Sequence, residues 1–470
     1  MSVLGCALGV PAAQAQSPRL PPPVAQALAR SGIPESGIAI VAQDVNSERP
    51  ILAVGDERAF NPASTIKLVT TYAALDMLGP AYTWTTEIYA AGPLQGDVLA
   101  GDLVIKGYGD PRLTLENFWL MLRALRARGV REIRGDLVLD RSYFAPVTDA
   151  DPASFDNEPT RPYNTIPDAL LVNFKAVRLQ FVPDAQQRRL AILAEPPLPQ
   201  LQILNNAVLD NEPCGDWVDR LKLTALGDAA GARFLFSGNY SVDCGEKERN
   251  YSVLGHPEYV HALFSLLWRE LGGTFTGNVR SVSGIPGNAR LLLSYKTQPL
   301  AEIVRDINKF SNNVMARQLY LSLGAIAYGP AADGEKSARM IRQWLALRQL
   351  PFPGLVLDNG SGLSRNERLS AGSLARLLRA AYHSAVMPEF IASLPIYAVD
   401  GTLKKRLAGN GIAGQAHIKT GSLAEVRAIA GYLLDSSGRT MVVVCIINHA
   451  RAALAQPVQD ALLGWVYQRP

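Results

Sequence analysis

The feature that most constrains the fold of this chain is a pair of apolar, strand-like segments at each of its ends. Residues 37–54 contain the runs GIAIVAQDV and PILAVG, separated by a short polar turn. Near the other end, EVRAIAGYLLD and TMVVVCIIN are separated by a Ser-Ser-Gly turn and followed by a closing helix. Because two short strands cannot cover their own faces, we expect all four to share one antiparallel sheet with helices on both faces. Both ends of the chain would then build a single α/β domain.

The residues between the two ends change character twice. A chain of 470 residues exceeds what one hydrophobic core holds, so several domains are expected. Glycine-broken strand pieces surround an amphipathic helix at about 114–128, and residues 171–240 alternate short strands with proline-containing turns, which predicts all-β structure. Helical periodicity then returns at about 297–307, 312–325 and 334–349. We therefore predict that residues of about 86–285 are an insertion into the domain built from the chain ends.

The composition fits a folded globular protein, with 48% apolar and 19% charged residues. The formal net charge is +4 and no long Lys/Arg run occurs. Nucleic acid is therefore not expected as a partner, whereas mild attraction to an anionic polymer is compatible with this charge. No stretch approaches 18 uninterrupted apolar residues, which predicts no membrane-spanning helix and at most peripheral membrane contact.

The N-terminus has features of an export signal. Residues 3–15, VLGCALGVPAAQA, are apolar and end in Ala13-Gln14-Ala15, an A-x-A cleavage pattern. The positively charged segment that usually precedes such a stretch is missing. We interpret residues 1–15 as the remnant of a signal peptide; the alternative is a frayed apolar terminus.

Cysteine usage agrees with export. Cys445 lies in an apolar run and is expected to be a buried free thiol. Cys214 and Cys244 flank a loop-rich segment and would pair in an oxidising compartment; the alternative is two unrelated buried thiols. No C-x-x-C pair or H-E-x-x-H helix occurs, and His256 and His261 have the wrong spacing for metal ligands. Neither a catalytic metal nor another cofactor is expected.

Two short motifs carry the candidate chemistry. Ser64-Thr65-Ile66-Lys67 opens a largely apolar helix expected at about 64–78. From the 27 serines and 11 lysines of the chain, about 0.6 S-x-x-K matches are expected by chance, so this motif alone means little. Lys419-Thr420-Gly421 is more specific: about 0.09 K-[ST]-G matches are expected by chance, and this is the one that occurs. The two motifs are companions in a class of serine enzymes.

The third motif of that class is S-x-N, and three copies occur, at residues 237–239, 311–313 and 364–366. Ser311-Asn312-Asn313 opens the helix NNVMARQLYLSLG, so its polar side chains sit at a loop-to-helix junction that can face a cleft. The first copy lies in the predicted β-rich stretch and the third in a polar loop. Order along the chain and placement therefore favour residues 311–313.

With these motifs in place, the chain resembles the low-molecular-mass class C penicillin-binding proteins, the D-alanyl-D-alanine carboxypeptidase/endopeptidase family related to penicillin-binding protein 4. The resemblance covers essentially the whole chain after the leader. It rests on PASTIKLVTTYAAL, GDLVIKGYGDPRL, FSNNVMARQL, DNGSGLSR and HIKTGSL. It implies a multidomain α+β protein: a serine β-lactamase/DD-peptidase-like α/β domain, an antiparallel sheet flanked by helices, with a long two-domain insertion rich in β-structure.

The resemblance also implies domain boundaries. The catalytic domain would comprise residues 16–85 and 285–470. One inserted domain would comprise 86–170 and 242–284, and a β-rich inserted domain would comprise 171–241.

Ser64 is the proposed nucleophile, and Lys67, one helical turn later, its base. A lysine with an ordinary pKa of about 10.4 is protonated at neutral pH and cannot act as a base. Burial and a second cation, Lys419, would lower the pKa of Lys67 in the required direction. The resemblance further implies that the backbone N–H groups of Ser64 and Ser422 form the oxyanion hole.

The remaining motif residues would handle protons and substrate. Ser311 can relay a proton to the leaving amine, and Asn313 can hold the lysine and the substrate amide. Lys419 and Thr420 would bind the terminal carboxylate of a peptide, and Gly421 would let the ligand approach the edge strand closely.

A second group of residues is expected at the substrate's far end. Arg365, in DNGSGLSR, matches a family arginine near the cleft; the alternative is a surface salt bridge. Asp156, Glu158 and Tyr163 lie where the family's second domain recognises the diaminopimelate amine. The spacing to Tyr163 favours Glu158 over Asp156.

The resulting function is acyl transfer in the periplasm. The chain would act as a serine D-Ala-D-Ala carboxypeptidase and DD-endopeptidase on peptidoglycan muropeptides, through an acyl-enzyme on Ser64, and β-lactams would acylate the same serine. One alternative is a serine β-lactamase or esterase on the same fold, for which no glutamate placed as a deacylation base is evident. The other is a non-catalytic peptidoglycan-binding protein, against which the complete motif set argues. The oligomeric state is open, with a dimer as one option.

Overall fold

The computed structural model describes residues 20–146, 151–228, 231–406 and 411–469. The predicted signal-peptide remnant, residues 1–15, lies outside this range.

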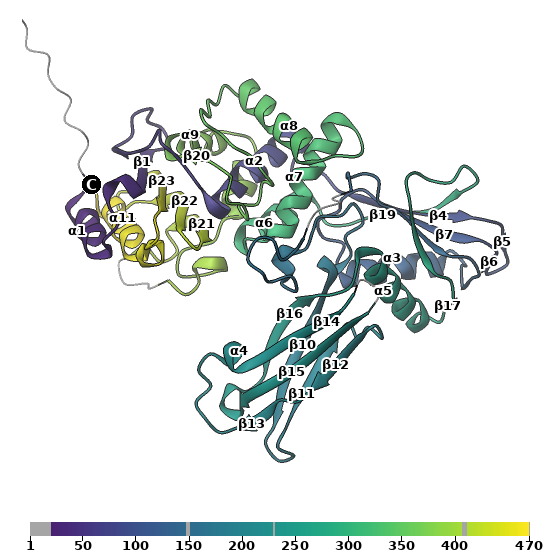
Figure 1. Cartoon of the computed structure of the whole chain (residues 1–470). Helices are drawn as coiled ribbons and strands as arrows, with labels where there is room; N and C mark the ends of the chain where they lie inside the picture. Colours follow the sequence, from purple (N-terminus) through teal and green to yellow (C-terminus); the bar gives the residue numbers. More distant parts are fainter. Residues whose placement is uncertain (1–19, 147–150, 229–230, 407–410, 470) are drawn as a thin grey trace, which may run out of the picture.

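One five-stranded antiparallel sheet joins the two ends of the chain, as predicted (Figure 1). Its strand order is β2-β1-β23-β22-β21, and every neighbouring pair is antiparallel. The strands are β1 (Ile38–Asp44), β2 (Leu52–Val54), β21 (Ala416–Leu423), β22 (Val426–Leu434) and β23 (Thr440–Asn448). Lys419-Thr420-Gly421 lies inside β21, an edge strand of the sheet.

Helices cover both faces of this sheet because its side chains alternate between two cores. In β1, Ile40 belongs to a cluster with α1 (Pro22–Ser31) and α11 (Gln456–Gln468), whereas Val41 belongs to a cluster on the opposite face. That second cluster contains residues of α2 (Lys67–Leu78), α6 (Leu300–Lys309), α7 (Asn313–Tyr328), α8 (Gly334–Leu347) and α9 (Ala371–Tyr382). The helices predicted from periodicity after residue 296 are confirmed as α6, α7 and α8.

The insertion starts with a second five-stranded sheet, of order β18-β9-β7-β4-β19. Its strands are β4 (Thr85–Ala91), β7 (Asp102–Gly107), β9 (Leu137–Asp140), β18 (Val279–Val282) and β19 (Arg290–Lys296). It shares one hydrophobic core with α3 (Leu115–Ala127) and α5 (His256–Glu270). The helix predicted at about 114–128 is confirmed as α3, which Thr114 caps by accepting a hydrogen bond from the backbone N–H of Asn117.

The stretch predicted to be all-β forms two small sheets that extend away from the rest of the molecule (Figure 1). They comprise β10 (Ala176–Asp184), β11 (Arg189–Glu195), β12 (Leu201–Asn205), β13 (Val208–Asp210), β14 (Leu221–Gly227), β15 (Ala232–Ser241) and β16 (Lys247–Ser252). One short helix, α4 (Trp217–Arg220), interrupts the pattern. The sequence-based boundary ended the β-rich domain at residue 241. In the structure β16, which follows that residue, pairs with β10, so the sheets extend beyond the boundary.

The predicted cysteine pair is present, since Cys214 and Cys244 form a disulfide within this β-rich part. Cys445 is a buried free thiol in β23, as expected. Among the described residues, no group of three or more His, Cys, Asp and Glu side chains is arranged to hold a metal ion. None of the helices in the described ranges is long and apolar enough to cross a membrane.

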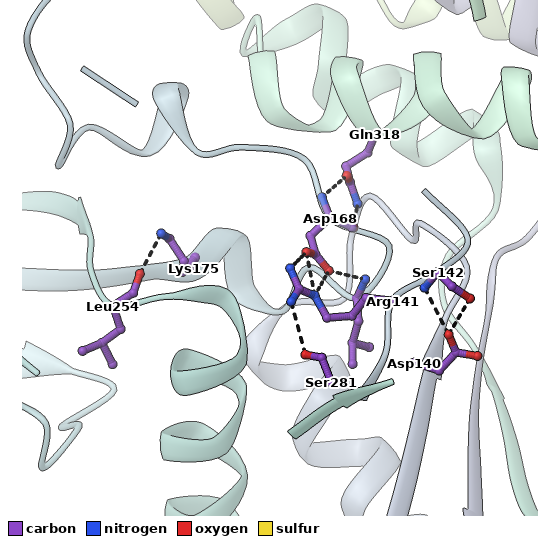
Figure 2. Close-up of polar contacts among 9 residues, drawn as sticks. Asp140, Arg141, Ser142, Asp168, Lys175, Leu254, Ser281 and Gln318 are labelled. Atoms are coloured by element: carbon purple, nitrogen blue, oxygen red, sulfur yellow. Dashed lines mark hydrogen bonds and ion pairs between the residues drawn. The ribbon is translucent and has the colours of Figure 1, made fainter. Parts of the chain in front are cut away.

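Polar contacts join the insertion to the helix that begins at Asn313 (Figure 2). Gln318 of α7 accepts a hydrogen bond from the backbone N–H of Asp168 at 2.9 Å and donates to the Asp168 carbonyl at 2.8 Å. The Asp168 carboxylate is in turn paired with Arg141, at the end of β9. The buried two-way bond between Gln318 and Asp168 ties the insertion directly to a helix of the sheet domain.

Candidate active site

Ser64 lies in a tight turn rather than in the helix proper. Residues Ala63–Ile66 form a 3-10 turn, and α2 begins only at Lys67. The predicted helix start at residue 64 is therefore corrected by one turn. Ala63 has a positive φ of 44°, an uncommon conformation for a residue other than glycine. The turn leaves Ser64 partly exposed while Lys67 is fully buried.

The amine of Lys67 is held by three oxygen atoms. Its Nζ lies 3.1 Å from Ser64 Oγ, donates to Asn313 Oδ1 at 2.6 Å, and donates to the backbone carbonyl of Ser361. The last two partners are carbonyl oxygens, which can only accept. A neutral amine has two N–H groups and one lone pair. If both hydrogens of neutral Lys67 point to these two carbonyls, its lone pair is left to face Ser64. This geometry suits a base that removes the Ser64 proton.

The electrostatics favour this neutral form. Burial lowers the pKa of Lys67 well below its ordinary value, and the positive charge of Lys419 lowers it further. The negative charge of Glu367 acts in the opposite direction and raises the pKa of Lys67. Both causes predicted from the sequence, burial and the second cation, are thus present.

Lys419 and Ser311 form the second half of the site. Lys419 is fully buried, and its Nζ donates to Ser311 Oγ at 2.9 Å and to the Thr420 carbonyl at 2.7 Å. Burial lowers the pKa of Lys419 to about 7. Ser311 has a positive φ of 56°, and Asn312 caps α7 by accepting a hydrogen bond from the backbone N–H of Met315 at 3.0 Å. The predicted loop-to-helix junction is confirmed.

The reactive side chains open into one cleft of about 450 Å³. Its lining includes Ser64, Ser311, Thr420, Gly421 and Ser422. A Cβ placed on Gly421 would lie only 3.0 Å from the Ser64 backbone nitrogen, so β21 packs tightly against the turn that carries Ser64. Beyond β21 the same cleft is lined by two cationic side chains, Arg406 and Arg427.

The loop that supplies the Ser361 carbonyl was not predicted to reach Lys67. Gly360 and Gly362 flank Ser361 and have positive φ values of 67° and 84°. A Cβ on Gly362 would lie 2.2 Å from the Ala63 carbonyl oxygen, so this loop touches the backbone beside Ser64. The Gly-Ser-Gly spacing in DNGSGLSR was the available signal, because glycines are needed where two backbones approach this closely.

The second predicted group assembles around Asp156 rather than Glu158. Tyr163 donates its phenol hydrogen to Asp156 Oδ2 at 2.8 Å, and Asn164 donates to Asp156 Oδ1 at 2.7 Å. Glu158 is exposed. Asp156 is thus the carboxylate that Tyr163 contacts, whereas the preference for Glu158 as the residue that meets the substrate stays a prediction. Asn157, between the two acids, has a positive φ of 60°.

Arg365 belongs to the same group. It donates to the Phe155 carbonyl at 3.0 Å, and its guanidinium lies 5.2 Å from the centre of the Phe155 ring. These contacts join the Gly-Ser-Gly loop of the sheet domain to the residue that precedes Asp156. The alternative reading of Arg365 as half of a surface salt bridge receives no support from the ion pairs of the described residues.

Known proteins are similar to this chain in sequence and in fold. A D-alanyl-D-alanine carboxypeptidase of an Actinomadura species is 29% identical over 420 residues, which cover 85% of this chain and 76% of the relative. The D-alanyl-D-alanine carboxypeptidase DacB of Haemophilus influenzae is 24% identical over 421 residues, covering 88% and 86%. The solved structure of penicillin binding protein 4 from Haemophilus influenzae matches with a TM-score of 0.79 at 24% identity, covering 95% of this chain and 99% of that chain.

The family model extends over nearly all of the described chain. The model described as the D-Ala-D-Ala carboxypeptidase 3 (S13) family matches residues 22–469. This span includes both halves of the shared sheet, the insertion and all three motifs. The chain therefore belongs to the D-Ala-D-Ala carboxypeptidase 3 (S13) family.

Proposed function

We propose that this protein is a serine D-Ala-D-Ala carboxypeptidase and DD-endopeptidase that cleaves peptidoglycan peptides through an acyl-enzyme on Ser64. The observation that carries the proposal is the arrangement of Lys67. Its Nζ lies 3.1 Å from Ser64 Oγ, and its other two partners are oxygens that only accept hydrogen bonds. A buried lysine of lowered pKa with its lone pair toward a serine is what activation of that serine requires.

Acylation then proceeds by transfer of one proton. Ser64 Oγ attacks the carbonyl carbon of the penultimate D-alanine, and its proton passes to Lys67 Nζ. The oxygen of the tetrahedral intermediate is stabilised by the backbone N–H groups of Ser64 and Ser422, and one such donor is typically worth about 3 kcal/mol. Collapse of the intermediate breaks the peptide bond, and the leaving amine takes the proton from Lys67 through the Ser311 hydroxyl, which returns Lys67 to its neutral form. Water later hydrolyses the ester, which frees Ser64.

Substrate binding uses the other side of the cleft. Charged Lys419, bonded to Ser311 Oγ, and the Thr420 hydroxyl would hold the terminal carboxylate of the peptide. Asn313 directs its oxygen to Lys67, so its NH₂ group remains for the substrate carbonyl. β-Lactams carry a similar carboxylate and an acylating carbonyl, so they would acylate Ser64 and block it. The complex of penicillin binding protein 4 from Haemophilus influenzae with a β-lactam is consistent with this use of the fold.

A fluorescent penicillin tests the proposal. The protein without residues 1–15 is expected to become covalently labelled, and the Ser64→Ala variant is expected to remain unlabelled. The matched control is Ser237→Ala, which alters the S-x-N copy in the insertion and should label normally. Absence of label on the unmodified protein, or equal label on Ser64→Ala, would refute the proposal. Rapid turnover of a chromogenic cephalosporin would instead identify a serine β-lactamase.

Two substrates separate the two peptidase activities. Release of D-alanine from a monomeric pentapeptide measures the carboxypeptidase, and conversion of a cross-linked muropeptide dimer to monomers measures the endopeptidase. We also propose a periplasmic location, where peptidoglycan peptides occur; the A-x-A pattern and the disulfide support this proposal.

Asp156 is proposed to recognise the free amine at the far end of the diaminopimelate residue, assisted by Tyr163 and Arg365. Asp156→Asn should lower kcat/KM for a peptide with a free amine at that position but not for its N-acetylated form. The exposed Glu158→Gln is the matched control and should change neither value. An equal loss on both peptides would contradict this role of Asp156.

A further inference from the structure

Glu367 is a buried carboxylate that the mechanism above leaves without a task. Its side chain is fully shielded from solvent, just before β20 (Leu369–Ser370). One oxygen, Oε1, accepts hydrogen bonds from the backbone N–H groups of Gly360 at 2.8 Å and Asn359 at 3.2 Å. The other, Oε2, is buried without a hydrogen-bond partner in the described chain. A half-satisfied buried carboxylate is costly, so its presence calls for a compensating role.

The two N–H groups belong to the loop that reaches the reactive lysine. The next carbonyls along this loop are both occupied by side chains of α2: Gly360 accepts from Thr70 Oγ1 at 2.8 Å, and Ser361 accepts from Lys67 Nζ. Glu367 therefore binds the N–H groups of the same loop whose carbonyl groups accept hydrogen bonds from α2 and from Lys67. A shift of this loop would move the Ser361 carbonyl, and a misplacement of about 1 Å can cost about 100-fold in rate.

The charge of Glu367 also acts on the base. Four titratable groups face this carboxylate: Lys67 from α2, Arg317 and Tyr320 from α7, and Asp358 from its own loop. Burial raises the pKa of Glu367 to about 7, and the positive charge of Lys67 partly opposes this rise. Reciprocally, Glu367 is the negative charge that raises the pKa of Lys67 against the effects of burial and Lys419.

This charge matters most during the reaction. When Lys67 accepts the Ser64 proton, a second cation forms in a solvent-free site that already contains Lys419. Two neighbouring buried cations repel each other strongly unless an anion compensates them. Glu367 is placed to provide that compensation without touching the substrate, since its bonded oxygen faces the loop backbone.

We propose that Glu367 is a positioning residue for acylation, which holds Lys67 through the backbone of residues 359–361 and supplies the buried negative charge that stabilises Lys67 when it takes the Ser64 proton. This inference rests on the proposed serine acyl-transfer function.

The test measures the second-order rate of acylation by a fluorescent penicillin between pH 5 and 9, with thermal melting followed in parallel. Glu367→Gln keeps a carbonyl oxygen for the two N–H groups but removes the charge. Above about pH 7, where Glu367 is ionised in the unmodified protein, the acid limb that reports protonation of Lys67 should move to lower pH, because the charge that raises the lysine pKa is gone. Its plateau rate should fall about tenfold, since a weaker base accepts the proton less readily. Glu335→Gln, which alters an exposed acid of α8 that is not among the charges acting on Lys67 or Glu367, should leave the acid limb in place.

Three results would overturn the proposal: an unchanged profile in Glu367→Gln, a lower plateau of Glu367→Gln with an unmoved acid limb, or an equal shift in Glu335→Gln. If Glu367→Gln does not fold, Glu367→Asp replaces it, because it retains the charge but is too short to bond both N–H groups. For Glu367→Asp, a lower plateau rate with the acid limb at the same pH as in the unmodified protein would support the proposal. An unchanged plateau rate would overturn it. Failure of the unmodified protein to label would instead refute the proposed function itself.

Discussion

The pKa of Lys419, lowered by burial to about 7, makes a sharp prediction about pH dependence. The charged form of Lys419 is present below that pH and is lost as the pH rises through it. If this charge binds the terminal carboxylate of the substrate, kcat/KM for an ordinary D-Ala-D-Ala peptide should decline above pH 7, by about tenfold per pH unit at first. A charge-assisted hydrogen bond is worth about 1.5–3 kcal/mol, so the decline should level off after roughly 10- to 150-fold.

The matched substrate is the same peptide with a C-terminal carboxamide. It has no carboxylate to lose, so its kcat/KM should be lower at pH 6 but should show no decline above pH 7. Both substrates should share one acid limb, because both need neutral Lys67, whose pKa is lowered by burial and by Lys419. Steady-state kinetics over pH 5–9.5 in a constant-ionic-strength buffer give both limbs. Identical alkaline limbs for the two peptides would refute the assignment of carboxylate binding to Lys419.

Three further predictions concern the architecture around the site. Asn313→Ala removes one of the two carbonyls that hold the base, so the penicillin acylation rate should fall about 100-fold with little change in melting temperature; an unchanged rate would contradict the role of that amide. Gly362→Ala would place a Cβ 2.2 Å from a backbone oxygen and should abolish labelling. Its control, Gly438→Ala, has the same φ of +84° but nothing within 4 Å, so it should cost only about 1 kcal/mol of stability. Equal shifts of the melting temperature in the two variants would disprove the close contact. Loss of the Cys214–Cys244 disulfide in a double serine variant should lower the free energy of unfolding by about 3 kcal/mol in urea titrations while labelling persists, and unchanged stability would show that the cross-link is dispensable.

Local patterns predicted much of the secondary structure. The apolar runs at the two ends, α3 and the helices after residue 296 all follow from side-chain periodicity, which records one buried face per element. The joining of both ends in one sheet followed from the same reasoning, since unpaired apolar strands need partners. Boundaries were less accurate: α2 begins one turn later than predicted, because Ala63–Ile66 tightens into a 3-10 turn. The period of a 3-10 helix, about 3.0 residues, differs from that of an α-helix, about 3.6 residues, but a stretch of 4 residues is too short for side-chain periodicity to reveal the change.

What the sequence by itself determined was which candidate groups to look for and their order: Ser64, Lys67, Ser311, Asn313 and Lys419. The structure brings these side chains together at one cleft. Short motifs can point to such a set because they record which functional groups a reaction needs, and their order excludes most chance matches.

Only the tertiary structure decided how these groups meet. The partners of the Lys67 amine lie 246 and 294 residues away, so no local pattern could reveal that its lone pair faces Ser64. The hydrogen bond of Tyr163 to Asp156, and the approach of Glu367 to the loop that holds the base, likewise depended on how the chain folds. Such contacts arise from packing between segments that are distant in the sequence, so local patterns do not record them directly. The glycines on either side of Ser361, which permit two backbones to approach closely, are the kind of indirect signal that the sequence retains.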